Sequence, residues 1–183
     1  MIRALVPLAD GFEEIEAVSI IDILRRGGVR VVTASLAASH EVRGAHDIVL
    51  RADAMLRDVA GETFDAVVLP GGPAYATLMK SGDVLSTLRR HAEAGKVTAA
   101  ICAAPAVLAE AGLLAGKRAT CYPSVEDVVG AAATLDRRAV VADGDVVTSR
   151  GPATATAFGI ELLRKLAGSP VGDKVAADML ATA

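Results

Sequence analysis

The sequence is poor in aromatic residues and carries no excess of positive charge. Only 3% of its 183 residues are aromatic, and tryptophan is absent. Proteins that bind single-stranded nucleic acid stack the bases on aromatic side chains, so this composition argues against that class. The net charge of −3 argues in addition against nucleic acid, or an anionic membrane surface, as the main partner.

Cysteine and histidine are also scarce. Two cysteines, Cys102 and Cys121, are too few for a disulfide framework, and no cysteine or histidine spacing typical of a zinc site is present. The three histidines, His40, His46 and His91, stand among polar residues, and we interpret each as a solvated surface side chain. We therefore expect no metal site.

Long apolar runs are missing as well. No stretch approaches the length of a membrane span, and the N-terminus lacks the basic, apolar and small-residue order of a signal peptide. A cytoplasmic location is therefore expected. A chain of 183 residues, of which 52% are hydrophobic, is long enough for one packed core, so we expect a single domain over residues 1–183.

The most informative stretch is residues 97–108, VTAAICAAPAVL. Five β-prone residues lead into Cys102, and Pro105 then opens a segment with helical spacing. A strand, a sharp turn and a helix in this order are typical of a nucleophile elbow, which needs small neighbours such as Ala100 and Ala104. The start of the helix would favour a thiolate. From this stretch alone, a buried structural cysteine is an equally good interpretation.

Strands and helices alternate along the rest of the chain. This alternation predicts an α/β fold in which a mostly parallel sheet lies between helices on both faces. A hairpin at 42–50 is expected outside the main sheet, and Ser124 is expected to cap a helix. The expected strands are 2–8, 29–36, 65–69, 97–101, 118–121, 139–142 and 146–149, and the expected helices are 13–26, 78–94 with a break at 81–82, 124–130, 152–166 and 171–180.

Several candidate residues follow the ends of the expected strands. Parallel sheets bind ligands beyond the carboxyl ends of their strands, so these residues are expected to share one crevice. The helical spacing places Glu16 on the buried stripe of the helix 13–26, but it leaves Glu13 open as an alternative. The candidates are Glu16, Gly71, Gly72, Cys102, Tyr122 and Ser149.

Four motifs together resemble the ThiJ/PfpI superfamily, in the branch of the parkinsonism-associated protein deglycase and its bacterial relative YajL. They are GFEEIE at 11–16, LPGG at 69–72, AAICAAP at 99–105 and TSRGP at 148–152. They occur in order, at similar spacing, and the resemblance covers nearly the whole chain. It implies a flavodoxin-like three-layer sandwich and a homodimer.

The resemblance also assigns roles to residues. It implies that Cys102 is the nucleophile and that Glu16 is its carboxyl partner, which decides between Glu16 and Glu13. Backbone N–H groups would hold an oxyanion or a sulfinate, and a serine would lie beside the sulfur. These positions are Gly72, Ala103 and Ser149, with Gly71 and Tyr122 lining the site.

Two positions depart from the wider superfamily. Its protease-like and amidotransferase-like members often carry a histidine base directly after the nucleophile, where this chain has Ala103. The human-like branch has a histidine where this chain has Tyr122. Peptidase chemistry, or any other mechanism that needs a histidine base, is therefore not expected.

A cysteine beside a carboxyl group fits two functions. We expect the pair to share one proton, with Cys102 ionised and Glu16 protonated near neutral pH. Such a pair could convert small α-oxoaldehydes, for example methylglyoxal to lactate, or release them from glycated amines, with no cofactor. Alternatively, the protein is a redox sensor or stress-linked chaperone whose cysteine is oxidised to sulfenate or sulfinate.

Two further features concern partners of the site and of the chain. Cys121 could act as a resolving thiol for Cys102, although a packed strand cysteine is the better interpretation. The helix 13–26 is apolar over more of its circumference than one sheet face can cover. We interpret the second apolar face as the contact of a homodimer.

Overall fold

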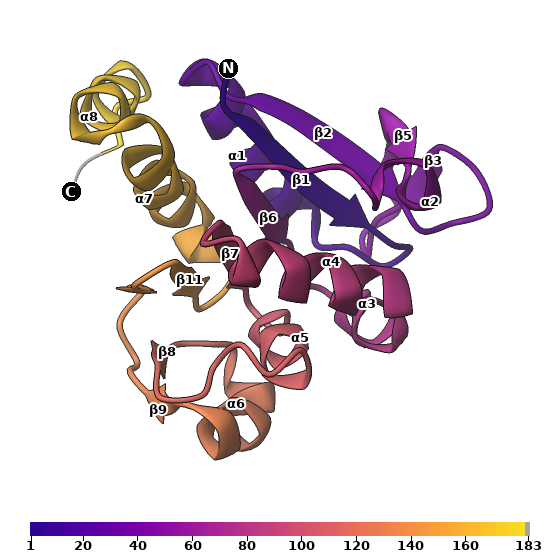
Figure 1. The fold of residues 1–183 in the computed structure, drawn as a ribbon. Helices are drawn as coiled ribbons and strands as arrows, with labels where there is room; N and C mark the ends of the chain where they lie inside the picture. The colour runs from indigo at the N-terminus through magenta and orange to yellow at the C-terminus, as the bar shows by residue number, and fades with distance from the viewer. Residues whose placement is uncertain (182–183) are drawn as a thin grey trace.

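The computed structural model describes residues 1–181 and contains a seven-stranded sheet between two layers of helices (Figure 1). The strand order is β10-β11-β7-β6-β1-β2-β5, and all neighbouring strands are parallel except β10 and β11. This confirms the predicted α/β sandwich. The strands are β1 Arg3–Leu8, β2 Arg30–Ser35, β5 Ala54–Met55, β6 Ala66–Leu69, β7 Val97–Ile101, β10 Val140–Asp143 and β11 Val146–Ser149.

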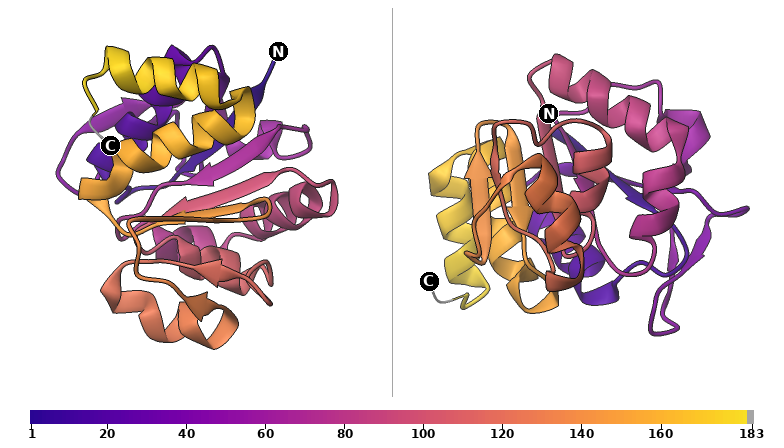
Figure 2. Two further views of the ribbon diagram at one scale, coloured as in Figure 1. Left: turned by 90° about the vertical axis from the view of Figure 1, so that its left-hand side faces the viewer. Right: turned by 90° about the horizontal axis from the view of Figure 1, so that it is seen from below.

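Helices cover both faces of the sheet (Figure 2). On one face α1 packs against α7, and α8 lies on α7; α3, α4 and α5 cover the other face, with α6 packed on α5. No helix among residues 1–181 has both the length and the hydropathy that crossing a membrane requires. The helices are α1 Glu14–Arg26, α2 Leu56–Val59, α3 Tyr75–Lys80, α4 Gly82–Glu93, α5 Pro105–Glu110, α6 Glu126–Ala132, α7 Ala155–Ala167 and α8 Ser169–Asp178.

The central strands are buried along their whole length. Every residue of β6 and β7 is buried, and their sequences, AVVL and VTAAI, are nearly continuous apolar runs. Such runs are typical of parallel strands that are covered on both faces. Because neighbouring parallel strands end at the same edge, the segments after β1, β6, β7 and β11 meet there.

Two small sheets lie outside the main one. The predicted hairpin is present as β3 Glu41–Arg43 and β4 Val49–Arg51. The expected strand 118–121 is shorter, because only β8 Arg118–Ala119 is extended, and it pairs with β9 Thr134–Leu135 rather than with the main sheet.

The start of α6 also differs from the prediction. A 3₁₀ turn at Pro123–Val125 precedes α6, and its N-cap is Val125, which makes no side-chain cap hydrogen bond. Ser124 is therefore not the cap, because the 3₁₀ turn displaces the start of the helix to Glu126.

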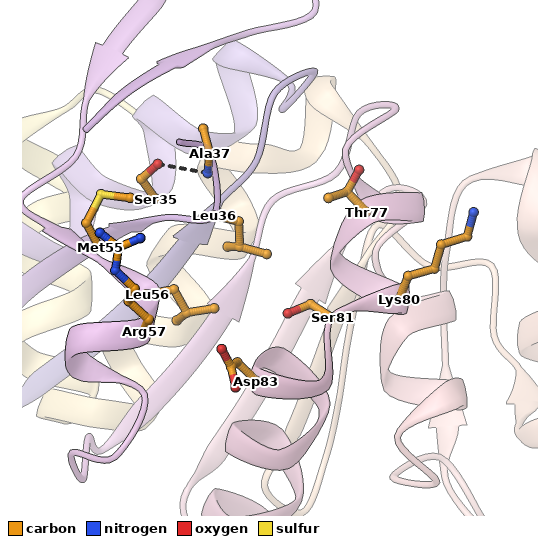
Figure 3. A pocket seen from close by; sticks show the side chains of 10 residues that line it. All are labelled: Ser35, Leu36, Ala37, Met55, Leu56, Arg57, Thr77, Lys80, Ser81 and Asp83. Atoms are coloured by element: carbon orange, nitrogen blue, oxygen red, sulfur yellow. Dashed lines mark hydrogen bonds between the residues drawn. The ribbon is translucent and has the colours of Figure 1, made fainter. Parts of the chain in front are cut away.

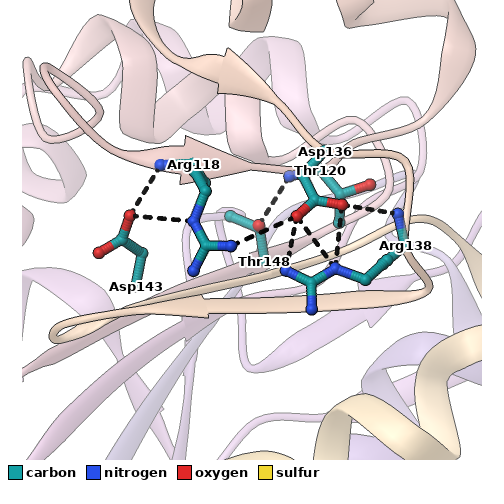
Figure 4. A network of polar contacts seen from close by, with 6 residues as sticks. All are labelled: Arg118, Thr120, Asp136, Arg138, Asp143 and Thr148. Atoms are coloured by element: carbon teal, nitrogen blue, oxygen red, sulfur yellow. Dashed lines mark hydrogen bonds and ion pairs between the residues drawn. The ribbon is translucent and has the colours of Figure 1, made fainter.

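A polar network holds β8 and β9 against the hairpin of β10 and β11 (Figure 4). The Arg118 N–H donates to Asp143 Oδ2 at 2.9 Å, and the Thr120 N–H donates to Thr148 Oγ1 at 2.9 Å. Asp136 pairs with the Arg118 and Arg138 side chains. The network fixes the chain that leads from β8 into residues 120–122.

One histidine lies in the core, contrary to the prediction that all three are solvated. His91 is 1% exposed, its Nε2 accepts the Phe64 N–H at 3.0 Å, and its Nδ1 lies 2.7 Å from the Thr87 carbonyl oxygen. Because Nε2 accepts, Nδ1 carries the proton of a neutral ring. Burial, with Arg90 and Lys96 nearby, lowers the pKa of His91.

The neutral state of His91 predicts loss of stability in weak acid. A folded-state pKa below the ordinary value of about 6.5 means that the unfolded chain binds the proton more readily, so stability is full above pH 6.5 and falls as the pH drops below it. Urea unfolding of wild type and His91→Gln between pH 5 and 7.5 measures this, with at most about 1.4 kcal/mol per pH unit at stake. His40→Gln, on the β3–β4 hairpin, serves as the control. Equal slopes for wild type and His91→Gln would contradict the assignment.

Candidate active site

Cys102 occupies the turn between β7 and α5. Its φ is 65°, in the left-handed region that residues other than glycine rarely adopt. Two backbone bonds hold this conformation: the Cys102 N–H donates to the Ser149 carbonyl oxygen at 3.0 Å, and the Tyr122 N–H donates to the Cys102 carbonyl oxygen at 2.7 Å. The predicted nucleophile elbow is therefore present, and 8% of Cys102 stays exposed.

Glu16, in the first turn of α1, is fully buried. Its Oε2 accepts the Gly71 N–H at 2.7 Å, whereas its Oε1 has no hydrogen-bond partner among residues 1–181. Glu13 has a different task, because its Oε2 accepts the Glu16 N–H at 2.7 Å and caps the helix. The geometry thus favours Glu16 over Glu13 as the partner of Cys102.

Gly71 brings the acid and the sulfur together. A Cβ atom at this position would lie 2.6 Å from Cys102 Cβ, 2.8 Å from Glu16 Oε2 and 2.9 Å from the Ile101 carbonyl oxygen. No side chain fits into this space. The sequence predicted Gly71 only as a lining residue, and the structure shows that its small size sets the geometry.

Two backbone N–H groups act on the sulfur. Hydrogen bonds from Gly72 and Ala103 lower the pKa of Cys102. Gly72 has φ of 82°, which glycine adopts without strain. A side chain there would meet the Gly11 carbonyl oxygen and the Glu13 nitrogen, so the backbone of this loop lies against the segment that precedes α1.

Burial dominates the acid–base properties of the pair. It raises the pKa of Glu16 to about 7, although the Gly71 N–H and Cys102 act in the opposite direction. Burial and then the Glu16 carboxylate raise the pKa of Cys102 to about 12, which outweighs the N–H groups of Gly72 and Ala103. The thiol pKa is thus raised and not lowered as expected, because desolvation penalises the thiolate and the nearby Glu16 carboxylate adds to this effect. The raised Glu16 pKa agrees with a carboxyl that holds a proton near pH 7.

The Ser149 hydroxyl lies elsewhere than expected. Its Oγ donates to the Ala139 carbonyl oxygen at 2.8 Å and lies 2.6 Å from Thr154 Oγ1. Ser149 is fully buried and contacts the elbow through its carbonyl oxygen, which accepts the Cys102 N–H. Its hydroxyl instead ties β11 to the turn before α7.

Tyr122 and Cys121 lie beside the elbow on the chain that follows β8. The Tyr122 side chain is 44% exposed, and a Cβ atom at Gly151 would lie 3.4 Å from its Cδ2. Cys121 is 1% exposed, and burial together with Glu126 raises its pKa to about 11. These properties suit a packed cysteine better than a resolving thiol.

Glu14 and His46 form a pair that sequence reasoning missed. The His46 N–H donates to Glu14 Oε1 at 2.5 Å, and its Nδ1 lies 2.7 Å from Glu14 Oε2. Within residues 1–181, Glu13, Glu14 and His46 are the group whose possible ligand atoms lie close enough for a metal ion. Because these atoms are already hydrogen bonded, we assign a hydrogen-bonded cluster and not a metal site. His46 is exposed, as predicted, but it is hydrogen bonded to Glu14.

A separate hollow of about 420 Å³ opens where β2 and β5 end (Figure 3). Leu36 and Leu56 form part of its wall, and Ser81 and Asp83, at the start of α4, lie across from them. No predicted site residue lines it, so it is distinct from the elbow.

Comparison with known proteins gives full-length matches. The profile of the DJ-1/PfpI family matches residues 2–165. Protein dj-1beta of Drosophila melanogaster is 41% identical over 179 residues, which cover 97% of this chain and 96% of the relative. The glutathione-independent glyoxalase DJR-1.2 of Caenorhabditis elegans is 36% identical over 158 residues, covering 85% and 83%.

Solved structures match equally well. The crystal structure of Drosophila melanogaster DJ-1beta superposes with a TM-score of 0.96 at 38% identity, covering 100% of this chain and 99% of the other. The structure of oxidised Toxoplasma gondii DJ-1 superposes with a TM-score of 0.95 at 37% identity, covering 100% of both chains.

The tight fit around Gly71 predicts that Gly71→Ala damages the site. The added methyl group must displace backbone or the Cys102 side chain, so we expect a loss of about 1–3 kcal/mol in unfolding free energy and slower alkylation of Cys102. Chemical denaturation and iodoacetamide kinetics measure the two effects. Gly82→Ala is the matched control, because nothing lies within 4 Å of a Cβ there. If both variants behave alike, the packing argument is wrong.

Proposed function

Because the chain belongs to the DJ-1/PfpI family, we propose that it converts small α-oxoaldehydes to 2-hydroxy acids through Cys102 and releases the same aldehydes from glycated amines. Methylglyoxal would yield lactate. The observation that carries the proposal is the buried Glu16 carboxyl, which has one oxygen free beside an elbow cysteine. A relative in Caenorhabditis elegans is named a glutathione-independent glyoxalase, which supports the same chemistry.

The first step is addition of the sulfur to the aldehyde carbon. The Cys102 thiol passes its proton to Glu16 as the C–S bond forms, which avoids a free thiolate in a buried site. A Glu16 pKa of about 7 suits a base that works near neutral pH. The product is a hemithioacetal, and the backbone N–H groups of Gly72 and Ala103 hold its negative oxygen.

The second step moves a proton between the two carbons of the substrate. The proton that Glu16 took from the thiol goes to the ketone oxygen, which restores the Glu16 carboxylate. Glu16 then removes the proton from the former aldehyde carbon and delivers it to the neighbouring carbon, while the negative oxygen on the former aldehyde carbon becomes the carbonyl oxygen of a thioester of the 2-hydroxy acid. Water then cleaves the thioester and restores the thiol. One carbon is oxidised while its neighbour is reduced, so the reaction needs no redox cofactor and no metal.

Deglycation starts from the same adduct. When the aldehyde carbon is already attached to an amine as a hemiaminal, the sulfur takes the place of the amine at that carbon: the C–S bond forms, the C–N bond breaks, and Glu16 passes the thiol proton to the leaving amine. The resulting hemithioacetal then follows the second step as before. Ala103 and Tyr122 offer no histidine base for either reaction, so Glu16 carries both proton transfers.

We propose that the protein acts as a homodimer through α1. Ile15 and Val18 on α1, and Ile48 and Val49 in the β3–β4 hairpin, are apolar side chains that are each 44–59% exposed. A groove of about 300 Å³ between α1 and β4 joins the two elements. Covering this surface with a second copy would remove it from water.

A redox role of Cys102 is the second candidate. A structural relative, Toxoplasma gondii DJ-1, is described in an oxidised form. In this chain the N–H groups of Gly72 and Ala103 could bind the oxygens of a sulfinate as well as an oxyanion. Peroxide-dependent holdase activity without turnover of methylglyoxal would favour this function over the enzyme.

Turnover of methylglyoxal without added thiol or cofactor tests the proposed enzyme. We expect Cys102→Ser to lower kcat/KM by at least about 1,000-fold, because the nucleophile is lost, and Glu16→Gln by about 100-fold or more, because proton transfer is lost. D- and L-lactate are quantified directly. Cys121→Ser and Glu161→Gln, which change residues outside the elbow, should keep wild-type rates. Full activity of either site variant would refute the mechanism.

The shared proton predicts the pH profile. Below about pH 7 the pair holds two protons, and above it one, so kcat/KM should rise through pH 7 as the pair loses its first proton. In Glu16→Gln this rise through pH 7 should be absent from the pH profile of the remaining turnover. If turnover is too slow to measure, the rate of alkylation of Cys102 by iodoacetamide gives the same profile. Persistence of this rise in Glu16→Gln would assign it to another group.

A further inference from the structure

Glu14 and His46 form a hydrogen-bonded contact between α1 and the β3–β4 hairpin. Glu14 is 5% exposed, and both of its carboxylate oxygens accept hydrogen bonds from His46. Gly44 faces this carboxylate so closely that a Cβ atom there would overlap Glu14 Oε1. The absence of a side chain at Gly44 therefore makes the pairing possible.

The same hairpin turn is bonded to the segment before α1. The Gly11 N–H donates to the Arg43 carbonyl oxygen at 2.7 Å, and the Ala45 N–H donates to the Phe12 carbonyl oxygen at 2.9 Å. The turn of residues 43–47 thus holds residues 11–14 by side-chain and backbone bonds together.

Residues 11–14 in turn support the glycine loop of the proposed active site. The Glu13 N–H donates to the Gly71 carbonyl oxygen at 3.0 Å, and the Ala74 N–H donates to the Gly11 carbonyl oxygen at 3.1 Å. The Gly71 N–H donates to Glu16 Oε2, and the backbone of the next residue, Gly72, packs against the Gly11 carbonyl oxygen and the Glu13 nitrogen, while its N–H lowers the pKa of Cys102. A continuous set of contacts therefore joins His46 to the N–H groups of the site.

The charges around His46 favour its protonated form. From α1 and its cap, Glu14 and Glu13 face the imidazole, and both raise its pKa, the Glu14 hydrogen bond most. From the hairpin, Asp47 and Arg43 pair with each other at 3.3 Å, and the Arg43 N–H donates to Asp10 Oδ1. The same contact with His46 keeps the pKa of Glu14 below its usual value in spite of burial.

We propose that His46 is a pH-responsive positioning residue of the Cys102 site. As a cation it holds the turn 43–47 against residues 11–14, and so keeps the N–H of Gly72 aimed at the sulfur. As a neutral ring it keeps only an N–H bond to Glu14, because the Coulomb attraction between imidazolium and carboxylate is lost with the proton. The effect on turnover rests on the proposed function, whereas the effects on the turn and on the thiol do not.

The raised pKa of His46 decides in which direction its contact with Glu14 depends on pH. The charge-assisted contact is complete below the ordinary histidine value of about 6.5 and is lost as the pH rises through the higher folded-state value. Within one copy of the chain the His46 side chain is 70% exposed, so water screens the gain there, and we expect effects of about two- to fivefold.

Two substitutions separate the charge of His46 from its hydrogen bond. Asn at position 46 can present an N–H donor in place of Nδ1 but is never charged, and Arg is always charged. His40→Asn is the matched control, because His40 lies in the same hairpin and its Nδ1 bonds the Ala52 carbonyl oxygen instead.

Hydrogen exchange of the Gly11 and Ala45 amides measures directly how firmly the turn 43–47 is bonded to residues 11–14. In wild type and His40→Asn, their protection factors should fall about two- to fivefold between pH 6 and pH 8.5. His46→Asn should show the low value, and His46→Arg the high value, at both pH values. If wild type and His46→Asn follow the same pH profile, the proposal is overturned.

Alkylation of Cys102 by iodoacetamide reads the site without any substrate. The rate ratio of wild type to His46→Asn should be about two- to fivefold at pH 6 and should approach one at pH 8.5, since the titration of Cys102 and Glu16 is common to both proteins. A ratio that does not change with pH would show a merely structural role and refute the proposal. A changing ratio in a protein that does not turn over methylglyoxal would support it while refuting the proposed enzyme.

Discussion

The close approach of the Gly71 backbone to Cys102 and Glu16 is the constraint on which this site depends. With no side chain at this position, the Gly71 N–H reaches Glu16 Oε2, and the N–H of the next residue, Gly72, lowers the pKa of the Cys102 thiol. One oxygen of the acid is thereby satisfied, whereas the other has no hydrogen-bond partner among residues 1–181, and Cys102 lies close enough to lower the pKa of the acid. A larger residue would separate the two groups that exchange a proton in the proposed mechanism.

Burial gives this pair its chemistry and also limits it. Desolvation raises the pKa of both groups, so ionising either of them in the buried site costs free energy. Transfer of the proton from sulfur to carboxyl keeps the total charge of the pair constant, whereas loss of the proton to solvent would leave a second buried charge. The proposed mechanism therefore needs no histidine at position 103, where this chain has Ala103, or at position 122, where it has Tyr122.

Local patterns in the sequence were sufficient to predict most of the fold and the strand–turn–helix at Cys102. The burial of β6 and β7, and the need for small residues around Cys102, apply to consecutive positions of the chain. Both therefore leave a pattern that can be recognised in the sequence. The Glu14 and His46 pair is different, because its members are 32 residues apart and neither belongs to a periodic pattern.

The incorrect predictions have the same origin. His91 follows a helical stripe of α4 into the core, but its polar sequence neighbours suggested a surface position. Ser149 lies next to the elbow as the motif implied, yet its hydroxyl turns to Ala139 and Thr154, a choice that only tertiary packing decides. Burial and hydrogen-bond direction thus depended on contacts that sequence spacing does not contain.

Gly44 bears on how this chain can change over evolution. Any side chain at position 44 would expel the Glu14 carboxylate from its buried place, and a shorter residue at position 14 would open the space that a side chain at 44 needs. Substitutions at positions 44 and 14 are therefore expected to occur together. Lineages that lose the glycine should lose the acid as well, and divergence at one position would be recorded as covariation with the other.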